Sequence, residues 1–243
     1  TYPKVDRKTQ ENTLDSLFCK ETLSPVHISS VEKKFMVSRN EFYIAAALLA
    51  IAINTNKNDV RVSWIYNGRD DLASKSSVGL LCRELSAALR LRDKTNLSVI
   101  FTEIHEQVRD GIKYSCYPYM ANVPQDDEGD IVCVLYQRDI READDFDGMN
   151  VNKVEIAHNN AAAQSVLDIQ ILDNEDGLQY VFDYAASRYE RETMTAFQNL
   201  FKRVVAAIVN NANTDGYDFE RLKKDVCGNR GLMHKIKAIF SRK

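Results

Sequence analysis

The stretch from residue 38 to residue 69 reads SRNEFYIAAALLAIAINTNKNDVRVSWIYNGR and contains the two clearest local signals in the chain. At its start, Ser38 and Glu41 have the spacing of a capping box, in which the hydroxyl and the carboxylate each satisfy a backbone N–H at a helix start. The residues that follow, to about 54, are apolar on nearly every side. This pattern predicts a helix over about 39–54 that runs through the middle of the molecule rather than along its surface.

The second signal is a strand. Residues 60–66 (VRVSWIY) are rich in β-branched and aromatic side chains, as strands are. Asn67 and Gly68 follow and end the strand, because both residues tolerate a positive φ. Arg69 is therefore expected to lie just after the C-terminal end of this strand.

The rest of the compact part repeats helical and strand patterns. Helices are predicted from apolar stripes, and strands from alternation and from β-branched content. Residues 166–172 turn at Asn174 to Gly177 and pair with 178–184 as a hairpin. Helices that alternate with strands, followed by a late hairpin, predict an α/β fold with a mixed β-sheet flanked by helices. The further predicted elements are helices over about 96–113 and 190–211, an alternating strand after Arg83 that ends at Leu91, and strands over 131–137, 151–157, 166–172 and 178–184.

The domain organisation follows from a change in composition. Residues 1–212 are predicted to form one domain, and residues 213–243 a basic, partly helical tail. Between residues 216 and 243 there are eight Lys or Arg against three Asp or Glu. One face of the tail would suit a partner or a membrane surface, although a solvated helix packed back on the domain is the favoured interpretation. That face comprises Leu232, Ile236, Ile239 and Phe240.

Composition excludes several classes of protein. The net charge is −3, from 32 basic and 35 acidic residues spread along the chain. This distribution lacks the basic patch that is typical of proteins that bind nucleic acid. The longest uncharged apolar run, residues 43–53, is shorter than the roughly 20 residues that span a bilayer. Five cysteines without a CxxC spacing argue against a disulfide framework and against a zinc site. We interpret them as reduced, mostly buried thiols of a cytoplasmic protein, and the opening at Thr1 as that of a piece of a longer chain.

Catalytic signatures are missing from the sequence. It contains no GxSxG, GxxxxGK[ST], GxGxxG or HExxH motif, so no nucleotide loop and no metal is implied. The four histidines are isolated from one another, and none is expected to act as a base. They are His27, His105, His158 and His234.

Four stretches carry a resemblance to a known family. They are Tyr2-Pro3-Lys4-Val5-Asp6-Arg7; Asn67-Gly68-Arg69 followed by Val78-Gly79-Leu80-Leu81-Cys82-Arg83; Tyr114-Ser115-Cys116-Tyr117-Pro118-Tyr119; and Leu167-Asp168-Ile169 through Gly177-Leu178 to Asp183-Tyr184. In this order they resemble the second half of the condensation domains of nonribosomal peptide synthetases. The sequence departs from that family at Arg83-Glu84, where Asn-Thr is usual, and at Tyr114, where His is usual.

The resemblance implies a fold and an activity. The fold would be one half of a two-lobed, chloramphenicol acetyltransferase-like structure whose active site lies at the seam between the halves. The activity would be amide bond formation between an acyl or peptidyl thioester and an aminoacyl amine. Both substrates would be tethered to peptidyl carrier domains by phosphopantetheine arms, with no cofactor bound directly. The HHxxxDG motif of the family lies in its N-terminal half and is absent here, so this chain alone is expected to be inactive without that half.

The resemblance also implies roles for particular residues. Arg69 matches the Gly-Arg whose guanidinium pairs with the Asp of HHxxxDG across the seam; the alternative is a surface Arg beside Asp70 and Asp71. Core packing is an equally good explanation for Val78 and Leu80. The residues expected to line the channel or the seam are Val78, Gly79, Leu81, Arg83, Tyr117, Pro118 and Tyr119.

Other functions stay open on the sequence alone. They are an epimerisation or cyclisation domain, a non-catalytic module that docks carrier or tailoring proteins, and an acyltransferase that uses free coenzyme A. The sequence upstream of Thr1 would discriminate among them. The residues do not indicate which amino acids or acyl groups are joined, or the oligomeric state.

Overall fold

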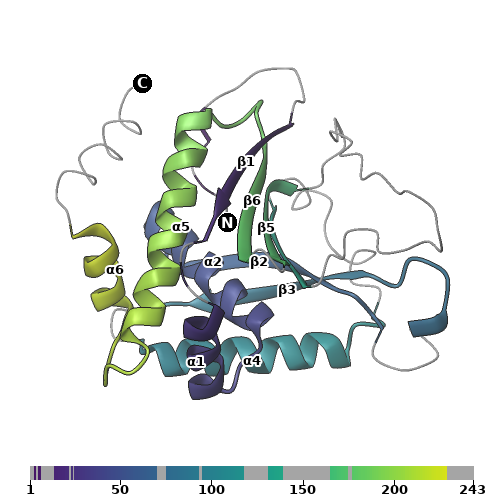
Figure 1. Ribbon diagram of the computed structural model, residues 1–243, viewed down its shortest axis with the longest axis horizontal. Helices are drawn as coiled ribbons and strands as arrows, with labels where there is room; N and C mark the ends of the chain where they lie inside the picture. The colour runs from purple at the N-terminus through teal and green to yellow at the C-terminus, as the bar shows by residue number, and fades with distance from the viewer. Residues whose placement is uncertain are drawn as a thin grey trace.

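The computed structural model describes residues 3, 5–6, 14–21, 23, 25–69, 75–92, 95–117, 131–138, 165–174 and 177–228 (Figure 1). These residues form one mixed sheet and helices packed against it, which confirms the predicted α/β class. The strands are β1 (Leu14–Lys20), β2 (Asp59–Tyr66), β3 (Arg83–Arg90), β4 (Ile131–Arg138), β5 (Ser165–Asn174) and β6 (Gly177–Ala185). The helices are α1 (Pro25–Phe35), α2 (Arg39–Thr55), α4 (Leu97–Lys113), α5 (Arg191–Asn211) and α6 (Phe219–Cys227).

The sheet has the strand order β1-β6-β5-β4-β2-β3. Strand β4 is parallel to both β2 and β5, and the other neighbouring pairs are antiparallel. The predicted hairpin is confirmed, with Asn174 paired to Gly177 at its turn. The strand predicted over 151–157 lies outside the described residues. Because β2 and β3 form one end of the sheet, the Gly-Arg that follows β2 lies near that end.

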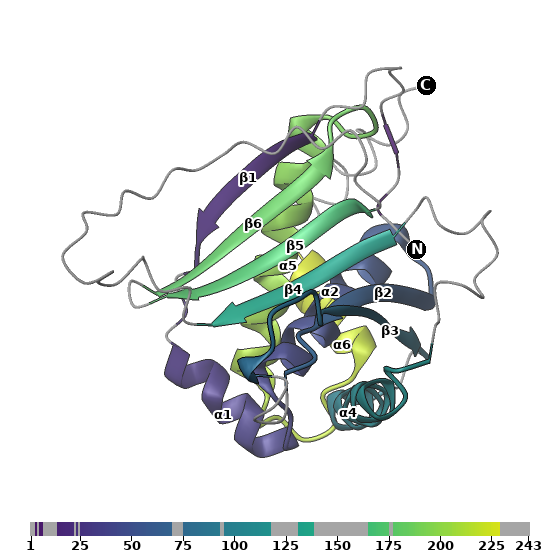
Figure 2. The ribbon, with the colours of Figure 1, turned by 90° about the vertical axis from the view of Figure 1, so that its right-hand side faces the viewer.

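Helix α2 is the centre of the core. Its capping box is present: the Ser38 hydroxyl accepts from the Glu41 amide at 3.3 Å, and the Glu41 carboxylate accepts from the Ser38 amide at 2.6 Å. Every side chain from Glu41 to Ile53 is buried, as expected for a helix that is apolar all round. Helix α2 packs on α4, α5, β2 and β4, and Figure 2 shows α2 and α5 behind the sheet. No described helix alone is long and apolar enough to cross a membrane; α1 and α2 meet that criterion only as a pair bent by 91°.

Two described elements, β1 and α1, lie where no element was predicted, and α6 lies within the tail that was predicted to be partly helical. Strand β1 is an edge strand whose inner side chains include Asp15, which accepts from the Tyr184 hydroxyl at 2.6 Å. Helix α1 begins with Pro25, a residue well suited to a first helical position. Helix α6 lies beyond the predicted boundary at 212. The inward-facing Asp15 weakens the strand pattern of β1, and the apolar stripes of α1 and α6 are short. These elements are therefore recognised only from their contacts with β6, α2 and α5.

The core continues past residue 212. Tyr217, Phe219, Leu222 and Val226 are all buried and belong to the same hydrophobic cluster as α2. The described part of the predicted tail therefore packs on the body of the domain. Residues 229–243, with the proposed partner or membrane face, lie outside the described residues, and for them the tail stays a prediction.

The N-terminal motif stretch caps helix α5 from a distance in sequence. The cap residue of α5, Glu190, makes no capping bond with its own side chain. Instead, the Asp6 carboxylate accepts from the Glu190 amide at 3.0 Å and from the Thr193 hydroxyl. The buried Tyr189 hydroxyl also donates to the Pro3 carbonyl at 2.8 Å. The chain that enters the domain at Pro3 is therefore fixed to the N-terminus of α5.

We expect Asp6→Ala to lower the free energy of unfolding by about 1–2 kcal/mol, the usual cost of losing an N-cap. Asp6→Asn keeps one oxygen acceptor and should lose less. Equilibrium urea unfolding of the two variants and the parent chain would measure this. An Asp6→Ala midpoint equal to that of the parent chain would show that the contact does not stabilise α5.

Candidate functional site

The turn after β2 requires a glycine. Gly68 has φ +68°, and a Cβ added to it would lie 2.3 Å from the carbonyl oxygen of Leu81. Neither feature suits an L-residue with a side chain. The contact brings the Gly-Arg pair against the segment that leads into β3. Two parts of one predicted motif, separated by thirteen positions, therefore touch.

The Arg69 side chain binds backbone carbonyl groups of the segment that leads into β3. Its guanidinium donates to the carbonyl oxygens of Ser77 and Gly79, both at 2.9 Å. The amide of Arg69 donates to the side-chain oxygen of Asn67 at 3.0 Å, which fixes the turn. The alternative explanation for Arg69 is a surface position beside Asp70 and Asp71. Those two residues lie outside the described part, and the carbonyl contacts are an arrangement that sequence reasoning missed.

Arg83 joins a second pair of motif stretches. Its guanidinium donates to the Ser115 hydroxyl at 2.9 Å and lies 3.3 Å from the Cys116 sulfur. This contact links the first residue of β3 to the turn that ends α4. Arg83 stands where the family usually has a small polar residue, and its length is what allows it to reach α4. Only the fold identifies Ser115 and Cys116 as the partners of Arg83, because no pattern in the sequence links these residues.

These contacts gather exposed apolar side chains at one place, which we call the motif edge. The motif edge consists of residues 67–69, 77–83 and 114–117. On it, Val78 and Leu80 are 104% and 90% exposed, and Tyr114 and Tyr117 are 61% and 64% exposed. Core packing, the alternative explanation for Val78 and Leu80, is therefore wrong. Gly79 is also exposed, Leu81 is half-buried, and Pro118 and Tyr119 lie outside the described residues.

The first and fourth motif stretches lie elsewhere. Asp6 is on the N-terminus of α5, as described above. In the fourth stretch, Asp168 on β5 lies directly opposite Asp183 on β6. The Asp183 carboxylate accepts from the Ser16 hydroxyl and from the Gln170 side-chain amide, the latter at 2.6 Å. These residues connect strands of the sheet, so only the second and third stretches share the motif edge.

Two of the four histidines and all five cysteines lie in the described part of the chain. His105 on α4 contacts the buried Glu41 carboxylate at 3.1 Å, and His27 is exposed on α1. His158 and His234 lie outside the described part. Burial raises the pKa of the Cys133 thiol to about 12, so this thiol stays neutral near pH 7. Within the described residues, no group of three His, Cys, Asp or Glu side chains is placed to hold a metal.

The expectation that the cysteines are mostly buried is wrong for two of them. Cys82 and Cys116 are exposed, and both belong to the motif edge. Their exposure has the same cause as that of Val78 and Leu80. The described residues do not cover the side chains at this edge of the domain. The other three cysteines are partly buried.

Solved structures share this fold. The chain aligns with a chain in the solved complex of the X-domain and OxyB from teicoplanin biosynthesis (TM-score 0.69, 13% identity), covering 90% of this chain and 52% of that one. It aligns with the condensation domain from monacolin K polyketide synthase MokA (TM-score 0.67, 12% identity), covering 90% and 55%. It also aligns with the epimerization domain from the third module of tyrocidine synthetase B (TM-score 0.64, 14% identity), covering 87% and 52%. The chain thus spans about half the length of each, and at these identities the likeness shows the fold.

The sequence itself gives the family. No curated protein sequence matches the chain. The family model described as Condensation domain matches residues 2–224, which is most of the chain and includes helix α6 up to Lys224. The chain therefore belongs to the condensation domain family.

Proposed function

We propose that this chain is the C-terminal half of a condensation domain and that its motif edge forms one wall of the site where an amide bond is made. The substrates would be an acyl or peptidyl thioester and an aminoacyl amine, each carried on the phosphopantetheine arm of a carrier domain. The observation that carries the proposal is the convergence of Arg69, Arg83 and the exposed Val78, Leu80 and Tyr117 at one edge.

The exposure of the motif edge supports its role as half of a seam. Aliphatic and aromatic side chains as exposed as Val78, Leu80 and Tyr117 are typical of a surface that another part of the protein covers. The chain spans about half of its structural relatives, so the N-terminal half of the same domain is the partner we propose for this surface. Two arginines held in place by hydrogen bonds would keep the surface in a fixed shape before the halves meet.

The contribution of such a wall to the reaction would be positioning. Holding two tethered substrates in a reactive arrangement can remove about 7–11 kcal/mol of a barrier without a side chain that transfers a proton. The described residues of this chain present arginines, carbonyls and apolar groups at the motif edge, and the family's HHxxxDG motif would come from the other half. We therefore expect the chain by itself to give no condensation.

The test uses the chain alone and the chain joined to its N-terminal half. Both are incubated with loaded donor and acceptor carrier domains, and the dipeptidyl product is measured by mass spectrometry. Product is expected only when both halves are present. Product from the chain alone would contradict the proposal, and no product from the joined halves would favour a docking module without catalysis.

We expect Arg83→Ala in the joined protein to lower turnover about tenfold while the unfolding midpoint changes little, because Arg83 orders the seam rather than the core. Arg90→Ala is the matched control, since Arg90 lies at the opposite end of the same strand and is 90% exposed. Its turnover should equal that of the parent. A large loss of stability in Arg83→Ala with unchanged turnover would place Arg83 in packing and not at the site.

A further inference from the structure

Strand β3 is the last strand of the sheet that the described residues form. In an antiparallel pair, alternate residues direct their N–H and C=O groups toward the partner and away from it. The Leu91 amide bonds the Asn58 carbonyl on the β2 side, so the outward groups belong to residues of even number from Glu84 to Arg90. Within the described residues no strand pairs with this row, and a row of this kind is a template for another strand.

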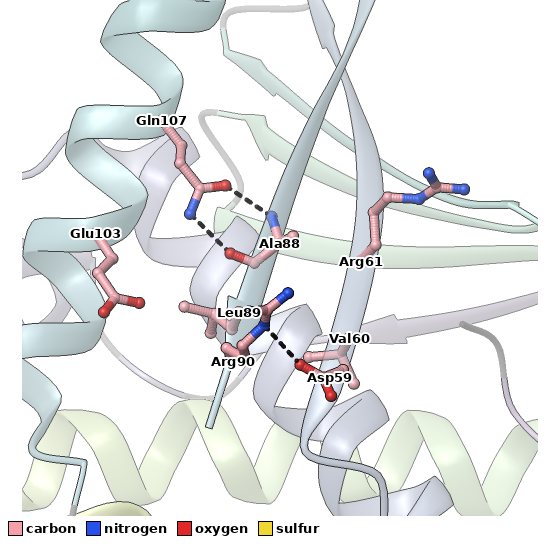
Figure 3. A pocket seen from close by; sticks show the side chains of 8 residues that line it. All are labelled: Asp59, Val60, Arg61, Ala88, Leu89, Arg90, Glu103 and Gln107. Atoms are coloured by element: carbon pink, nitrogen blue, oxygen red, sulfur yellow. Dashed lines mark hydrogen bonds and ion pairs between the residues drawn. The ribbon is translucent and has the colours of Figure 1, made fainter. Parts of the chain in front are cut away.

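One side chain occupies the centre of this row. Gln107, on the neighbouring helix α4, donates from Nε2 to the Ala88 carbonyl at 2.7 Å, and its Oε1 accepts from the Ala88 amide at 2.8 Å (Figure 3). A residue of an added antiparallel strand would make the same two bonds with its own N–H and C=O. The primary amide of Gln107 therefore takes the place of a backbone amide at Ala88.

The space beside this contact is a pocket of about 420 Å³. It lies at the opposite end of β2 and β3 from the motif edge, and Figure 3 shows Gln107 and Glu103 facing the strand from α4. Arg90 and Asp59 form an exposed ion pair at its rim, with 3.1 Å between the guanidinium and the carboxylate. The lining residues are charged or polar except for Val60, Ala88 and Leu89.

The edge sequence is complementary to itself. Two β3 strands placed antiparallel in the register of outward-facing residues put Glu84 of each copy opposite Arg90 of the other copy. In the same register, Ser86 lies opposite Ala88, so small side chains meet at the centre. Opposite charges at both ends and small residues between them favour this pairing over others. A second copy of the chain is therefore the partner that this edge would accept.

We propose that Gln107 is an edge guard, a side chain that keeps a second copy of the protein from adding to the sheet through β3. It satisfies the two groups at the centre of the register in which two copies would pair. Removing it leaves the Ala88 amide and carbonyl available to the second copy. The Asp59–Arg90 pair assists, because it engages the arginine that Glu84 of another copy would meet.

The first test measures mass against concentration by sedimentation equilibrium for the parent chain, Gln107→Ala and Glu103→Ala. Glu103 is the matched control, because it lies one turn earlier on α4 and lines the same pocket without taking part in the Ala88 contact. The parent and Glu103→Ala should stay monomeric. Gln107→Ala should show a twofold rise in mass with increasing concentration. A folded Gln107→Ala that stays monomeric at every concentration would overturn the proposal.

The second test locates the new contact. Ala88→Pro, added to Gln107→Ala, removes an outward N–H without removing a bond to β2, and it should return the protein to a monomer. Glu84→Arg added to Gln107→Ala should weaken the dimer by like charge, and Arg90→Glu added to both should restore it. A dimer that survives Ala88→Pro would lie on another surface and would overturn the assignment to β3.

A third measurement does not depend on the folding of a variant. In the parent chain, hydrogen exchange of the Ala88 amide should be several-fold slower than that of the Ser86 and Arg90 amides, whose outward position is the same. Equal exchange rates at the three positions would show that Gln107 does not hold the edge, and the proposal would fail.

Discussion

In a protein that carries both halves of the domain, we expect Arg69→Ala to lower the rate of condensation about 100-fold, the size of effect that a 1 Å misplacement of substrates produces. The structure gives the first reason. Arg69 holds the carbonyls of Ser77 and Gly79, which flank the exposed Val78. Without the guanidinium, this part of the proposed wall loses two charge-assisted hydrogen bonds and its fixed shape.

The second reason is the proposed ion pair with the Asp of HHxxxDG. A guanidinium has five donors in a planar fork, so it can hold two carbonyls and still offer donors to a carboxylate. Breaking a desolvated pair costs about 3–5 kcal/mol, because the remaining charge is buried without a partner. Arg69→Ala, the corresponding Asp variant and the double variant would measure this coupling in unfolding experiments. If the two losses simply add, Arg69 and that Asp do not interact.

The two roles of Arg69 are separable in the isolated chain, which lacks the Asp. There, Arg69→Ala should speed proteolysis within residues 75–82 while the unfolding midpoint of the core stays unchanged. Arg69→Lys is the matched variant, since it keeps the charge but loses the fork that reaches two carbonyls. Equal proteolysis of all three proteins would remove the loop-holding role and leave only the ion pair.

In the isolated chain, the largest loss of stability is expected at Arg39. Its guanidinium binds both carboxylate oxygens of Glu32, at 2.7 and 3.0 Å, and also reaches Asp173 at 3.2 Å and Ser29 at 2.8 Å. The hydrogen bonds that Arg39 donates to the Glu32 carboxylate raise the pKa of Arg39 above its ordinary value. Tyr136 donates to the same Asp173 oxygen at 2.7 Å. One side chain therefore links α1, α2 and β5 through a shared set of charges.

Arg39→Ala should lower the free energy of unfolding by about 3 kcal/mol, because it leaves two partly buried carboxylates without their cation. The three charged side chains are 14–19% exposed, which places the effect at the lower end for buried pairs. Guanidinium chloride unfolding would measure it, with Arg90→Ala as the control, whose exposed pair should contribute nothing measurable. A loss below about 1 kcal/mol for Arg39→Ala would show that solvent compensates the carboxylates.

Several parts of the fold were predictable because their causes lie within a few residues of one another. The capping box at Ser38 and Glu41 spans one helical turn, and the apolar content of α2 is a property of its own sequence. The hairpin of β5 and β6 is encoded by two alternating strands and the turn between them. The position of Arg69 just after β2 follows in the same way from the strand and from Gly68.

The partners of those residues were not predictable, because they depend on which surfaces the packed sheet brings together. Strand β1 pairs with β6 over sequence separations of 159 to 171 positions, and its inward-facing Asp15 interrupts the apolar alternation that would indicate a strand. Asp6 caps a helix that begins far along the chain, and Gln107 finds Ala88 only because α4 lies beside the edge of the sheet.

The sequence by itself determined the α/β class, the central helix and the family resemblance, since periodicity and short motifs are local properties. Only the tertiary structure decided that Val78 and Leu80 are exposed, that Arg69 binds carbonyls and that Arg83 reaches the end of α4. The reason is physical: a hydrogen bond or a buried contact between distant residues exists only after the chain has paid the entropy of bringing them together. That cost is met by the whole core, so no local pattern records which side chains will meet.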